Sequence, residues 1–512
     1  MQLENNTGLT VSSIFMESFD RVLNKSTEME INKGVPKLTE PPIIDFSNSV
    51  IQLNILSHYF VSTSNVNYTV ESSVSSEFNG KNTTPLPLFL NGYQFIKIPN
   101  KVDVDIRRYI GKRQLSKIHS NEDVAIELCL LFLSNLSDTY FRMLGIGFDL
   151  NESNQGGWKN LSSEKLRSQF NDKMTYKNII NVLFEGTSKG PMIECDGKDA
   201  FGQKCFGYRL AERYRMKGVS KYEIKTDYVR KMQQQKSDKR LKDVLSNSIC
   251  SSLIEMYPLS SLPNYTEMFE YGKVLAKGGY ITKKEKLLTF MNKNGRNYWK
   301  NPDERSFLED NMSIYSYLTE GGLLIPSPGG DRSGGRVVDS FTLMPSWQRN
   351  MLKIEGEQIQ TVDFSCLHPN LCISNYGGNK KYLTHDYVST MTGIDKKLIK
   401  KDHLSFFNKK YEDMIKSPLW AYYFQHEPEM LGNIIREKGN GKFGHKETSR
   451  NLFKKEVNIM TDVYTVLREK GIPAGYVYDA LFCKISDAQE VKRIMDEVAI
   501  HHGVFTTAKI EI

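Results

Sequence analysis

The sequence predicts an α+β fold in which an antiparallel sheet is accompanied by helices. Two stretches rich in β-branched and aromatic residues, 361–364 and 475–483, follow a strand pattern and each contains an aspartate. Between them, residues 446–470 repeat apolar side chains at helical spacing, and residues 488–500 predict another helix. Residues 503–512 predict a closing strand. The order strand, helices, hairpin, helix, strand therefore indicates one sheet that carries both aspartates.

Length and composition describe a globular chain of more than one part. The 512 residues exceed one ordinary core, so about two to four subdomains are expected. Hydrophobic residues make up 39% of the chain, charged residues 25%, and the mean hydropathy is −0.45. The longest apolar stretch, residues 125–133, contains Glu127 and is shorter than the roughly 18 residues of a membrane span. Neither a transmembrane helix nor a membrane partner is therefore expected.

The N-terminus and the cysteines predict an intracellular setting. The first residues lack the basic start and the apolar segment of a signal peptide. Seven cysteines are scattered without a CxxC pair, which argues against a zinc site and against a disulfide framework. We therefore expect a protein of a host cytoplasm or an organelle, not a secreted one.

The chain before the two aspartates divides into regions of different character. Residues 1–100 look loosely organised, and the Ser/Asn/Thr-rich stretch 73–87 reads as a linker or long loop. Residues 101–320 are mostly helical and basic in pattern. Within them, residues 172–225 predict a helix at 176–184 followed by two short strands. This order resembles a winged helix; a generic α+β linker module is the alternative.

One segment concentrates positive charge. The chain has a net charge of +8 and a pI of about 8.8. Residues 213–242 hold eleven Lys and Arg against three Asp and Glu, with Tyr214, Tyr222 and Tyr228 among them. Phosphate contact with base stacking is one interpretation. A solvated helix face is the other.

The two aspartates are the candidate catalytic carboxylates. Asp363 stands in TVDFSCLHPNL and Asp479 in YVYDAL, 116 residues later. Two carboxylates on neighbouring antiparallel strands repel each other, and divalent cations relieve that repulsion. Such a pair is the minimal frame for two-metal phosphoryl transfer. An ordinary turn or cap role is the alternative for either residue alone.

A basic helix is predicted between the aspartates, at residues 394–411. Four residues on one of its faces recur every four positions: Lys396, Lys400, Leu404 and Asn408. Lysines in this pattern could line a triphosphate and protonate its leaving group. A solvated basic face is the alternative, and Lys397 with Lys401 forms an equivalent pair one residue along.

Two arginines precede the first aspartate. Gly334-Gly335-Arg336 leaves room for a close backbone approach and places a guanidinium, which suits a phosphate backbone. Arg349 follows. A tight turn with a surface arginine is the alternative for Arg336.

In this order, the segments resemble motifs of family A DNA polymerases and single-subunit, phage-type RNA polymerases. The matching positions are Gly335-Arg336, Arg349, Asp363-Phe364-Ser365, Lys396, Lys400, Leu404, Asn408 and Val477-Tyr478-Asp479. The combination GGR…VDFSCLHP…LSFFN…YVYDAL resembles still more the transposon-virus polymerases, a compact branch found in mobile elements, phages and other viruses. The resemblance covers roughly residues 320–512.

The resemblance implies a right-hand polymerase. The antiparallel palm sheet and the fingers would occupy residues 321–512, with helical fingers at about 380–450. A helical thumb and template-binding region would occupy residues 101–320. The N-terminal region would be mostly helical.

The resemblance also implies an activity: a DNA-directed DNA polymerase of a virus or mobile element that uses two Mg²⁺ (or Mn²⁺) ions. Asp363, Asp479 and the carbonyl of Phe364 would hold the metal, and Lys400 would contact the triphosphate. Arg336 and Arg349 would contact nucleic acid or organise the palm. Primer–template DNA and nucleoside triphosphates are the implied partners, with a helicase or primase left open.

Lys396, Leu404, Asn408 and His368 match nucleotide-binding positions, with departures. Tyr478 stands where the relatives have His, Lys396 where they have Arg, and Asn408 where they have Tyr. His368 takes the place of a Glu in the DNA polymerases and a Gly in the RNA polymerases. An imidazole there would crowd a 2′-hydroxyl, which favours dNTPs.

Alternatives remain open. An RNA polymerase of the same superfamily is the nearest, and a non-catalytic nucleic-acid-binding factor is the other. A reverse transcriptase is less favoured, because Ala480 follows Asp479 where that family has a second aspartate. Glu456, on the helix before Asp479, is a lesser site candidate, for which a surface salt bridge is the alternative.

Overall fold

The computed structural model describes residues 84–85, 94–144, 156–197, 205–291, 304–439 and 444–511. The chain divides into two compact units, 1–81 and 82–512, and the described residues all belong to the second. The loosely organised region expected at 1–100 therefore lies largely outside the described residues.

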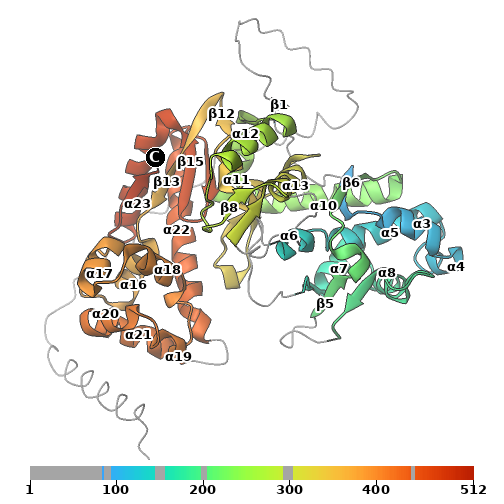
Figure 1. The fold of residues 1–512 in the computed structure, drawn as a ribbon. Coiled ribbons are helices and arrows are strands. Elements are labelled where there is room, and N and C mark those ends of the chain that lie inside the picture. The colour runs from blue at the N-terminus through green and yellow to red at the C-terminus, as the bar shows by residue number, and fades with distance from the viewer. Residues whose placement is uncertain are drawn as a thin grey trace, which may run out of the picture. The chain divides into compact units, whose positions relative to one another are not determined.

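A seven-stranded antiparallel sheet carries both aspartates (Figure 1). Its strand order is β1-β7-β12-β13-β15-β14, and β16 pairs with β13 off this path. The strands are β1 (Thr84–Pro85), β7 (Ser260–Leu262), β12 (Lys353–Ile354), β13 (Glu357–Phe364), β14 (Ala474–Val477), β15 (Ala480–Lys484) and β16 (Ala508–Ile510). Asp363 pairs with Ala480 of β15 on one side and with Lys509 of β16 on the other. The antiparallel arrangement expected for the two aspartate-bearing strands is thus observed.

Helices α11 (Ser248–Met256) and α23 (Ala488–His501) pack against this sheet. Helix α22 (Glu447–Glu469) packs on both of them, and its Tyr464 hydroxyl donates to the carbonyl of Ala474 in β14 (3.1 Å). The periodicity of residues 446–470 and 488–500 predicted α22 and α23 to within two residues. Leu452, Met460, Val463 and Leu467 of α22 are buried, as their spacing requires. The strand expected at 503–512 is limited to β16.

Helices α16–α21 pack on one another and on α22 (Figure 1), and α17–α21 lie within the stretch of about 380–450 for which helices were expected. They are α16 (Leu367–Tyr376), α17 (His385–Thr392), α18 (Lys396–Phe406), α19 (Tyr411–Met414), α20 (Leu419–His426) and α21 (Pro428–Lys438). The buried ammonium of Lys438 donates to the carbonyls of Phe407 (2.6 Å), Lys409 (3.0 Å) and His445 (2.9 Å). It ties the end of α21 to the end of α18, and burial lowers its pKa to about 8.

A separate hydrophobic core forms upstream, from residues between Ile96 and Met232. At its centre is α5 (Glu122–Ser134), which begins at the capping Asn121. Glu127 of α5 is buried and accepts hydrogen bonds from the backbone N–H groups of Lys225 (2.6 Å) and Thr226 (3.1 Å). The carboxylate therefore caps α10 (Asp227–Val244), since Thr226 is the residue before that helix.

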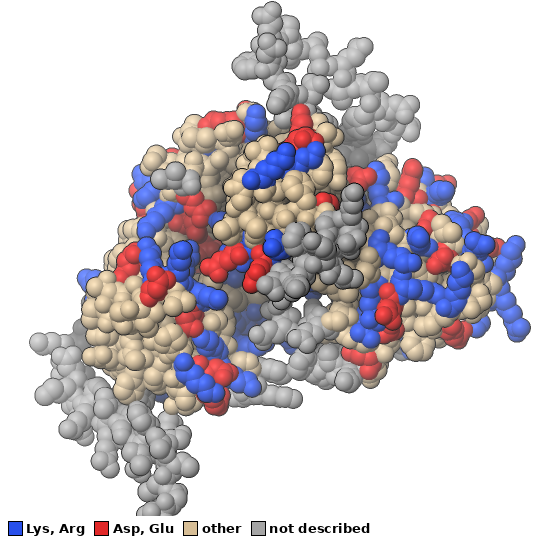
Figure 2. All heavy atoms as spheres, in the orientation of Figure 1, with Lys and Arg blue, Asp and Glu red and all other residues tan. Residues whose placement is uncertain are grey.

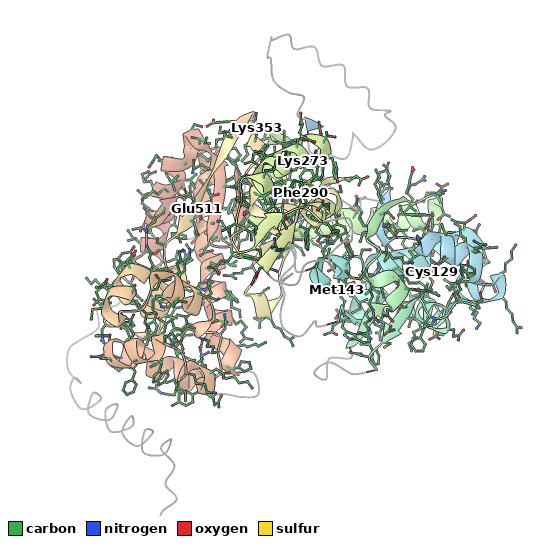
Figure 3. All side chains as sticks on the ribbon, viewed as in Figure 1. Cys129, Met143, Lys273, Phe290, Lys353 and Glu511 are labelled. Carbon is green, nitrogen blue, oxygen red and sulfur yellow. The ribbon has the colours of Figure 1, made fainter. Side chains whose placement is uncertain are left out.

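The helical stretch Glu122–Met143 is long and apolar enough to cross a membrane by length and composition. However, 83% of its most apolar window is buried inside the protein, as expected for a core helix. Cys129, labelled in Figure 3, lies in this core and is fully buried.

A small α/β arrangement adjoins α5. It comprises β3 (Lys159–Ser162), α7 (Ser163–Phe170), α8 (Lys173–Glu185), β4 (Ile193–Cys195) and β5 (Cys205–Leu210). The strands form an antiparallel sheet in the order β3-β5-β4. A helix followed by two strands was expected here, and α8, β4 and β5 have these positions.

The remaining helices are α3 (Val102–Tyr109), α4 (Lys112–Leu115), α6 (Thr139–Met143), α9 (Glu212–Arg215), α12 (Tyr265–Lys277), α13 (Leu308–Thr319), α14 (Ser340–Leu343) and α15 (Ser346–Arg349). The remaining strands are β2 (Phe95–Pro99) paired with β6 (Val219–Glu223), β8 (Leu287–Thr289) with β9 (Arg305–Phe307), and β10 (Ser327–Pro328) with β11 (Val337–Val338).

Candidate active site

Strand alternation sets the direction of the first aspartate. Val362 and Phe364 are buried in the core, so Asp363 between them lies on the opposite face of β13. The side chain of Asp363 is half-buried.

The second aspartate is placed beside the first by the β14–β15 hairpin. Tyr478 adopts a left-handed backbone conformation (φ 61°), and Asp479 completes the two-residue turn before β15. The backbone N–H of Phe364 donates to the carbonyl of Asp479 (3.3 Å). A backbone hydrogen bond therefore joins the residue after Asp363 to Asp479, and this brings the two predicted carboxylates together.

The surroundings of Asp363 and Asp479 disfavour ionisation of both carboxyl groups. Burial and the charge of Asp479 raise the pKa of Asp363 to about 8. The positive charges of Lys283 and Lys400 lower this pKa in part. Burial and the charge of Glu456 also raise the pKa of Asp479. Two adjacent carboxyls that the protein's own cations do not neutralise are suited to a divalent cation.

Asp363 and Asp479 are fewer ligands than a metal site built by protein side chains alone provides. Among the described residues, no group of three or more His, Cys, Asp or Glu side chains is assembled for a metal ion. Mg²⁺ is commonly bound by only one or two carboxylates together with substrate phosphates and water. Asp363 and Asp479 would be those two carboxylates; the Phe364 carbonyl stays a predicted further ligand.

Metal-free protein should lose stability as pH rises through the range in which Asp363 ionises. Its folded-state pKa of about 8 exceeds the ordinary value of about 3.9, so the fold favours the protonated form. This contribution is present below about pH 4 and is lost as pH approaches about 8, at up to about 1.4 kcal/mol per pH unit. In EDTA, the free energy of unfolding should fall between about pH 6 and pH 8, and Mg²⁺ should restore more stability at pH 8.

Urea unfolding at both pH values, with Mg²⁺ or EDTA, measures this dependence. In Asp363→Asn, the free energy of unfolding should depend less steeply on pH. The increase in this free energy on adding Mg²⁺ should also be smaller. A variant that keeps the wild-type slope and the full Mg²⁺ gain would remove Asp363 from the cation site.

A buried ion pair lies next to the carboxylates. Glu456 of α22 is fully buried and accepts hydrogen bonds from Nε (2.8 Å) and Nη2 (2.5 Å) of Arg336. Its Oε2 also lies 2.8 Å from Nε2 of His368. The same Nε2 lies 3.2 Å from Nη2 of Arg336, so this ring nitrogen contacts both members of the ion pair. Burial alone would raise the pKa of Glu456, but His368 and Arg336 lower it below the usual value.

Aromatic rings hold Arg336 in this position. Its guanidinium lies 3.8 Å from the ring centre of Phe453 and 4.7 Å from that of Tyr478. Gly334 (φ 64°) makes the close approach possible, since an added Cβ would lie 2.5 Å from the Cβ of Phe453. Gly334 thus makes room for the backbone of α22, and Arg336 turns inward to Glu456. The surface-arginine alternative for Arg336 and the surface-salt-bridge alternative for Glu456 are both wrong.

Arg349 also has a place inside the protein. Its Nη1 donates to the carbonyls of Phe341 (2.9 Å) and Met344 (3.3 Å). These bonds fix the segment between α14 and α15, and both expected roles of this arginine, contact with nucleic acid or organisation of a palm, stay predictions.

Lys400 of helix α18 is the predicted stripe residue whose charge acts on Asp363. Ile399, His403 and Phe406 form the buried face of this helix, and Lys396 and Lys400 lie on the flank of that face. Lys400 is exposed, and its charge lowers the pKa of Asp363.

The other predicted residues of this stripe lie further from the core. Lys396 forms an exposed ion pair with Asp386 (2.7 Å), and Leu404 is 73% exposed. Asn408 was expected within the helix, but α18 ends at Phe406, so Asn408 follows it. The cause is a long-range contact, since Lys438 binds the carbonyls of Phe407 and Lys409.

Three charged residues near Asp363 were not predicted. Glu511, labelled in Figure 3, follows β16 and raises the pKa of Asp363. Lys283 pairs with Glu511 (2.9 Å) and lowers the pKa of Asp363. Lys509 pairs in the sheet with Asp363 itself. The predicted closing strand was the one sequence signal for Glu511 and Lys509; Lys283 had none.

The basic segment 213–242 is engaged within the fold only in part, since most of its lysines, among them Lys217, Lys231 and Lys239, are exposed. Arg213 donates to the carbonyl of Gly190 (3.0 Å), and Arg230 to that of Ile224 (3.0 Å). Tyr214 is buried and donates to Asp105 (2.7 Å), and Tyr222 donates to Glu127 (3.2 Å). Bases therefore cannot stack on Tyr214 and Tyr222, because the rings of these tyrosines pack in the core and their hydroxyls are hydrogen-bonded there. The third tyrosine, Tyr228, is 53% exposed.

Comparison with known proteins finds remote likeness to solved structures and no match in sequence. No protein-family model and no curated protein matches the chain. Among solved structures, it is similar to the polymerase domain of Pol1 from M. smegmatis, described in complex with DNA primer–template and dNTP, with a TM-score of 0.32 and 9% identity. The match covers 55% of this chain and 73% of that chain. A TM-score below 0.5 does not establish a shared fold, so the roles of the site residues depend on their own geometry.

Proposed function

We propose that the chain is a template-directed nucleotidyltransferase, a DNA-directed DNA polymerase of a virus or mobile element that uses two Mg²⁺ (or Mn²⁺) ions. The observation that carries the proposal is the carboxylate pair: a backbone hydrogen bond joins Phe364, next to Asp363 of β13, to Asp479 in the β14–β15 turn, and both aspartates have raised pKa values. The motif order seen in the sequence supports the same activity.

The two carboxylates would supply the negative charge that binds the cations. Asp363 and Asp479 would hold the divalent cations, with the carbonyl of Phe364 as a further oxygen ligand. When bound, the cations would lower the pKa of a primer 3′-hydroxyl and neutralise phosphate charge. The protein's part is to hold both carboxyls rigidly, which β13 and the β14–β15 hairpin do by backbone hydrogen bonds.

Lys400 would provide positive charge near the carboxylates. Its ammonium is exposed and close enough to lower the pKa of Asp363. In this position it would contact the triphosphate and give a proton to the leaving pyrophosphate. Lys396, Leu404 and Asn408 would border the nucleotide further along the same side, and Arg336 and Arg349 would organise the sheet from behind.

His368 would contact the sugar. Its ring is fixed by Glu456 (2.8 Å) and lies 5.5 Å from the ring centre of Phe453. The side chain is 27% exposed, so part of the fixed ring is accessible to a ligand. A ring held in this way would crowd a 2′-hydroxyl and favour dNTPs.

Primer extension tests the proposed function. Full-length protein with a primed DNA template and Mg²⁺ should extend the primer with dNTPs and should stop when EDTA is added. Extension with NTPs alone would make the chain an RNA polymerase and keep the carboxylate site. No incorporation of either substrate would leave only a binding role.

Replacing His368 with Gly should weaken the discrimination against NTPs by about tenfold or more, because the space beside the 2′ position opens. The measurement is the ratio of kcat/KM for a dNTP and the matching NTP on one primed template. His426→Gly, on α20, serves as the control. An unchanged ratio in His368→Gly would rule out the ring as the sugar contact.

A further inference from the structure

A helix–turn–helix pair lies upstream of the carboxylate site, built by α7 and α8. The two helices are joined by Asn171 and Asp172 alone, and Asn171 adopts a left-handed conformation (φ 58°). The Asp172 carboxylate accepts a hydrogen bond from the backbone N–H of Thr175 (2.8 Å) and so begins α8.

The strands around this pair complete a recognisable topology. β3 precedes α7, while β4 and β5 follow α8, and the sheet order is β3-β5-β4. A helix pair followed by two paired strands is the winged-helix arrangement. It shares a core with α5, formed by Leu166 and Phe170 of α7 and by Ile179 and Leu183 of α8.

The outward face of α8 is built for contact. Met174, Lys177, Asn181 and Phe184 follow one another at spacings of three or four residues and therefore share one face. Met174 is 60% exposed and Phe184 is 52% exposed, and Lys177 and Asn181 are exposed with them. Lysine contacts phosphate, asparagine reads adenine, and apolar side chains contact the methyl group of thymine.

The charge of this region is complementary to nucleic acid. Residues 94–232 contain twenty-four Lys and Arg and seventeen Asp and Glu, so they hold most of the chain's net charge of +8. Figure 2 shows many Lys and Arg side chains on the surface over α3, α4, α7 and α8. Near α8, Arg167 is exposed, and so is Lys117, whose backbone carbonyl accepts from Asn178 (2.7 Å).

We propose that α8 is the recognition helix of a winged-helix module that binds duplex DNA in its major groove. The site is separate from the carboxylate pair and requires neither a metal ion nor a nucleotide. B-form DNA admits an α-helix in its major groove, whereas the major groove of A-form RNA is too narrow. The module would hold double-stranded DNA while the carboxylate site acts elsewhere on the substrate.

A binding assay with the full-length protein tests this module apart from catalysis. The probe is a labelled DNA duplex of about two helical turns, closed by a hairpin loop at both ends so that it offers no primer terminus. Fluorescence anisotropy in EDTA, at several salt concentrations, compares wild type with Lys177→Glu/Asn181→Ala/Phe184→Ala. Lys277→Glu, an exposed lysine of α12, is the matched control.

The triple variant should bind the closed duplex about tenfold or more weakly, with a shallower salt dependence, while Lys277→Glu binds as wild type. Circular dichroism and the thermal midpoint check that the variant is folded, and primer extension at saturating template should be retained. Unchanged duplex affinity would overturn the proposal. So would an equal loss for single-stranded DNA, or equal wild-type affinity for duplex RNA, because either result indicates charge attraction without groove recognition.

Discussion

Asp363→Asn is expected to lower the rate of nucleotide incorporation by about a thousandfold or more while leaving DNA affinity unchanged. Loss of one of two cation-binding carboxylates removes several kcal/mol of transition-state stabilisation, and about 1.4 kcal/mol corresponds to tenfold in rate. The substitution keeps the size of the side chain, and the backbone pairing with Ala480 and Lys509 does not depend on it. Single-turnover extension of a labelled primer measures the rate, and anisotropy measures the affinity.

Asp462→Asn is the matched control for this experiment. Asp462 lies on α22, is 61% exposed, and pairs with His502 (2.7 Å). It should extend primers at close to the wild-type rate. If Asp363→Asn retained incorporation, or lost DNA binding together with it, the carboxylate would be structural.

Glu456→Gln is expected to lower the free energy of unfolding by about 3 kcal/mol or more. Glu456 is fully buried and Arg336 is only 18% exposed, so the variant leaves a guanidinium largely out of water without its counter-charge. His368 loses its carboxylate partner as well. Urea unfolding should show the loss, and the discrimination between dNTPs and NTPs should fall with it because the imidazole is no longer fixed.

Two further variants separate the buried charge from the rest of the effect. Glu490→Gln removes an exposed partner of Arg493 and should unfold at the wild-type urea concentration. The double variant Arg336→Met/Glu456→Leu removes both charges and should be more stable than Glu456→Gln. If Glu456→Gln were as stable as wild type, the charge of Arg336 would be neutralised by another group.

The parts of the fold predicted from sequence are those set by local pattern. Apolar spacing of 3.6 identified α22 and α23, and β-branched and aromatic residues identified β13 and the β14–β15 hairpin. The adjacency of Asp363 and Asp479 followed from the same pattern, because a hairpin next to an antiparallel strand brings their ends together. The predicted extent of α18 was wrong. The helix ends at Phe406 because Lys438 binds the carbonyls that follow it, and Lys438 lies more than twenty residues further along the chain.

Contacts between distant segments were outside the reach of sequence patterns. Arg336 and Glu456 are 120 residues apart, and Lys283 and Glu511 are 228 apart. The glycines before Arg336 suggested a close approach of some backbone, but not that α22 would be that backbone. The basic segment 213–242 shows the converse: its composition resembles a nucleic-acid site, yet Arg213, Arg230 and two of its tyrosines serve the protein's own core.

The central claim is that Asp363 and Asp479 together hold the divalent cations of a nucleotidyl transfer. Crystals of the full-length protein with primer–template, a non-hydrolysable nucleotide and Mn²⁺ test it most directly, by anomalous diffraction at the manganese edge. We expect anomalous density between the two carboxylates, with the triphosphate on the side of Lys400. Manganese held elsewhere, with Asp363 and Asp479 bonded only to protein groups, would contradict the claim.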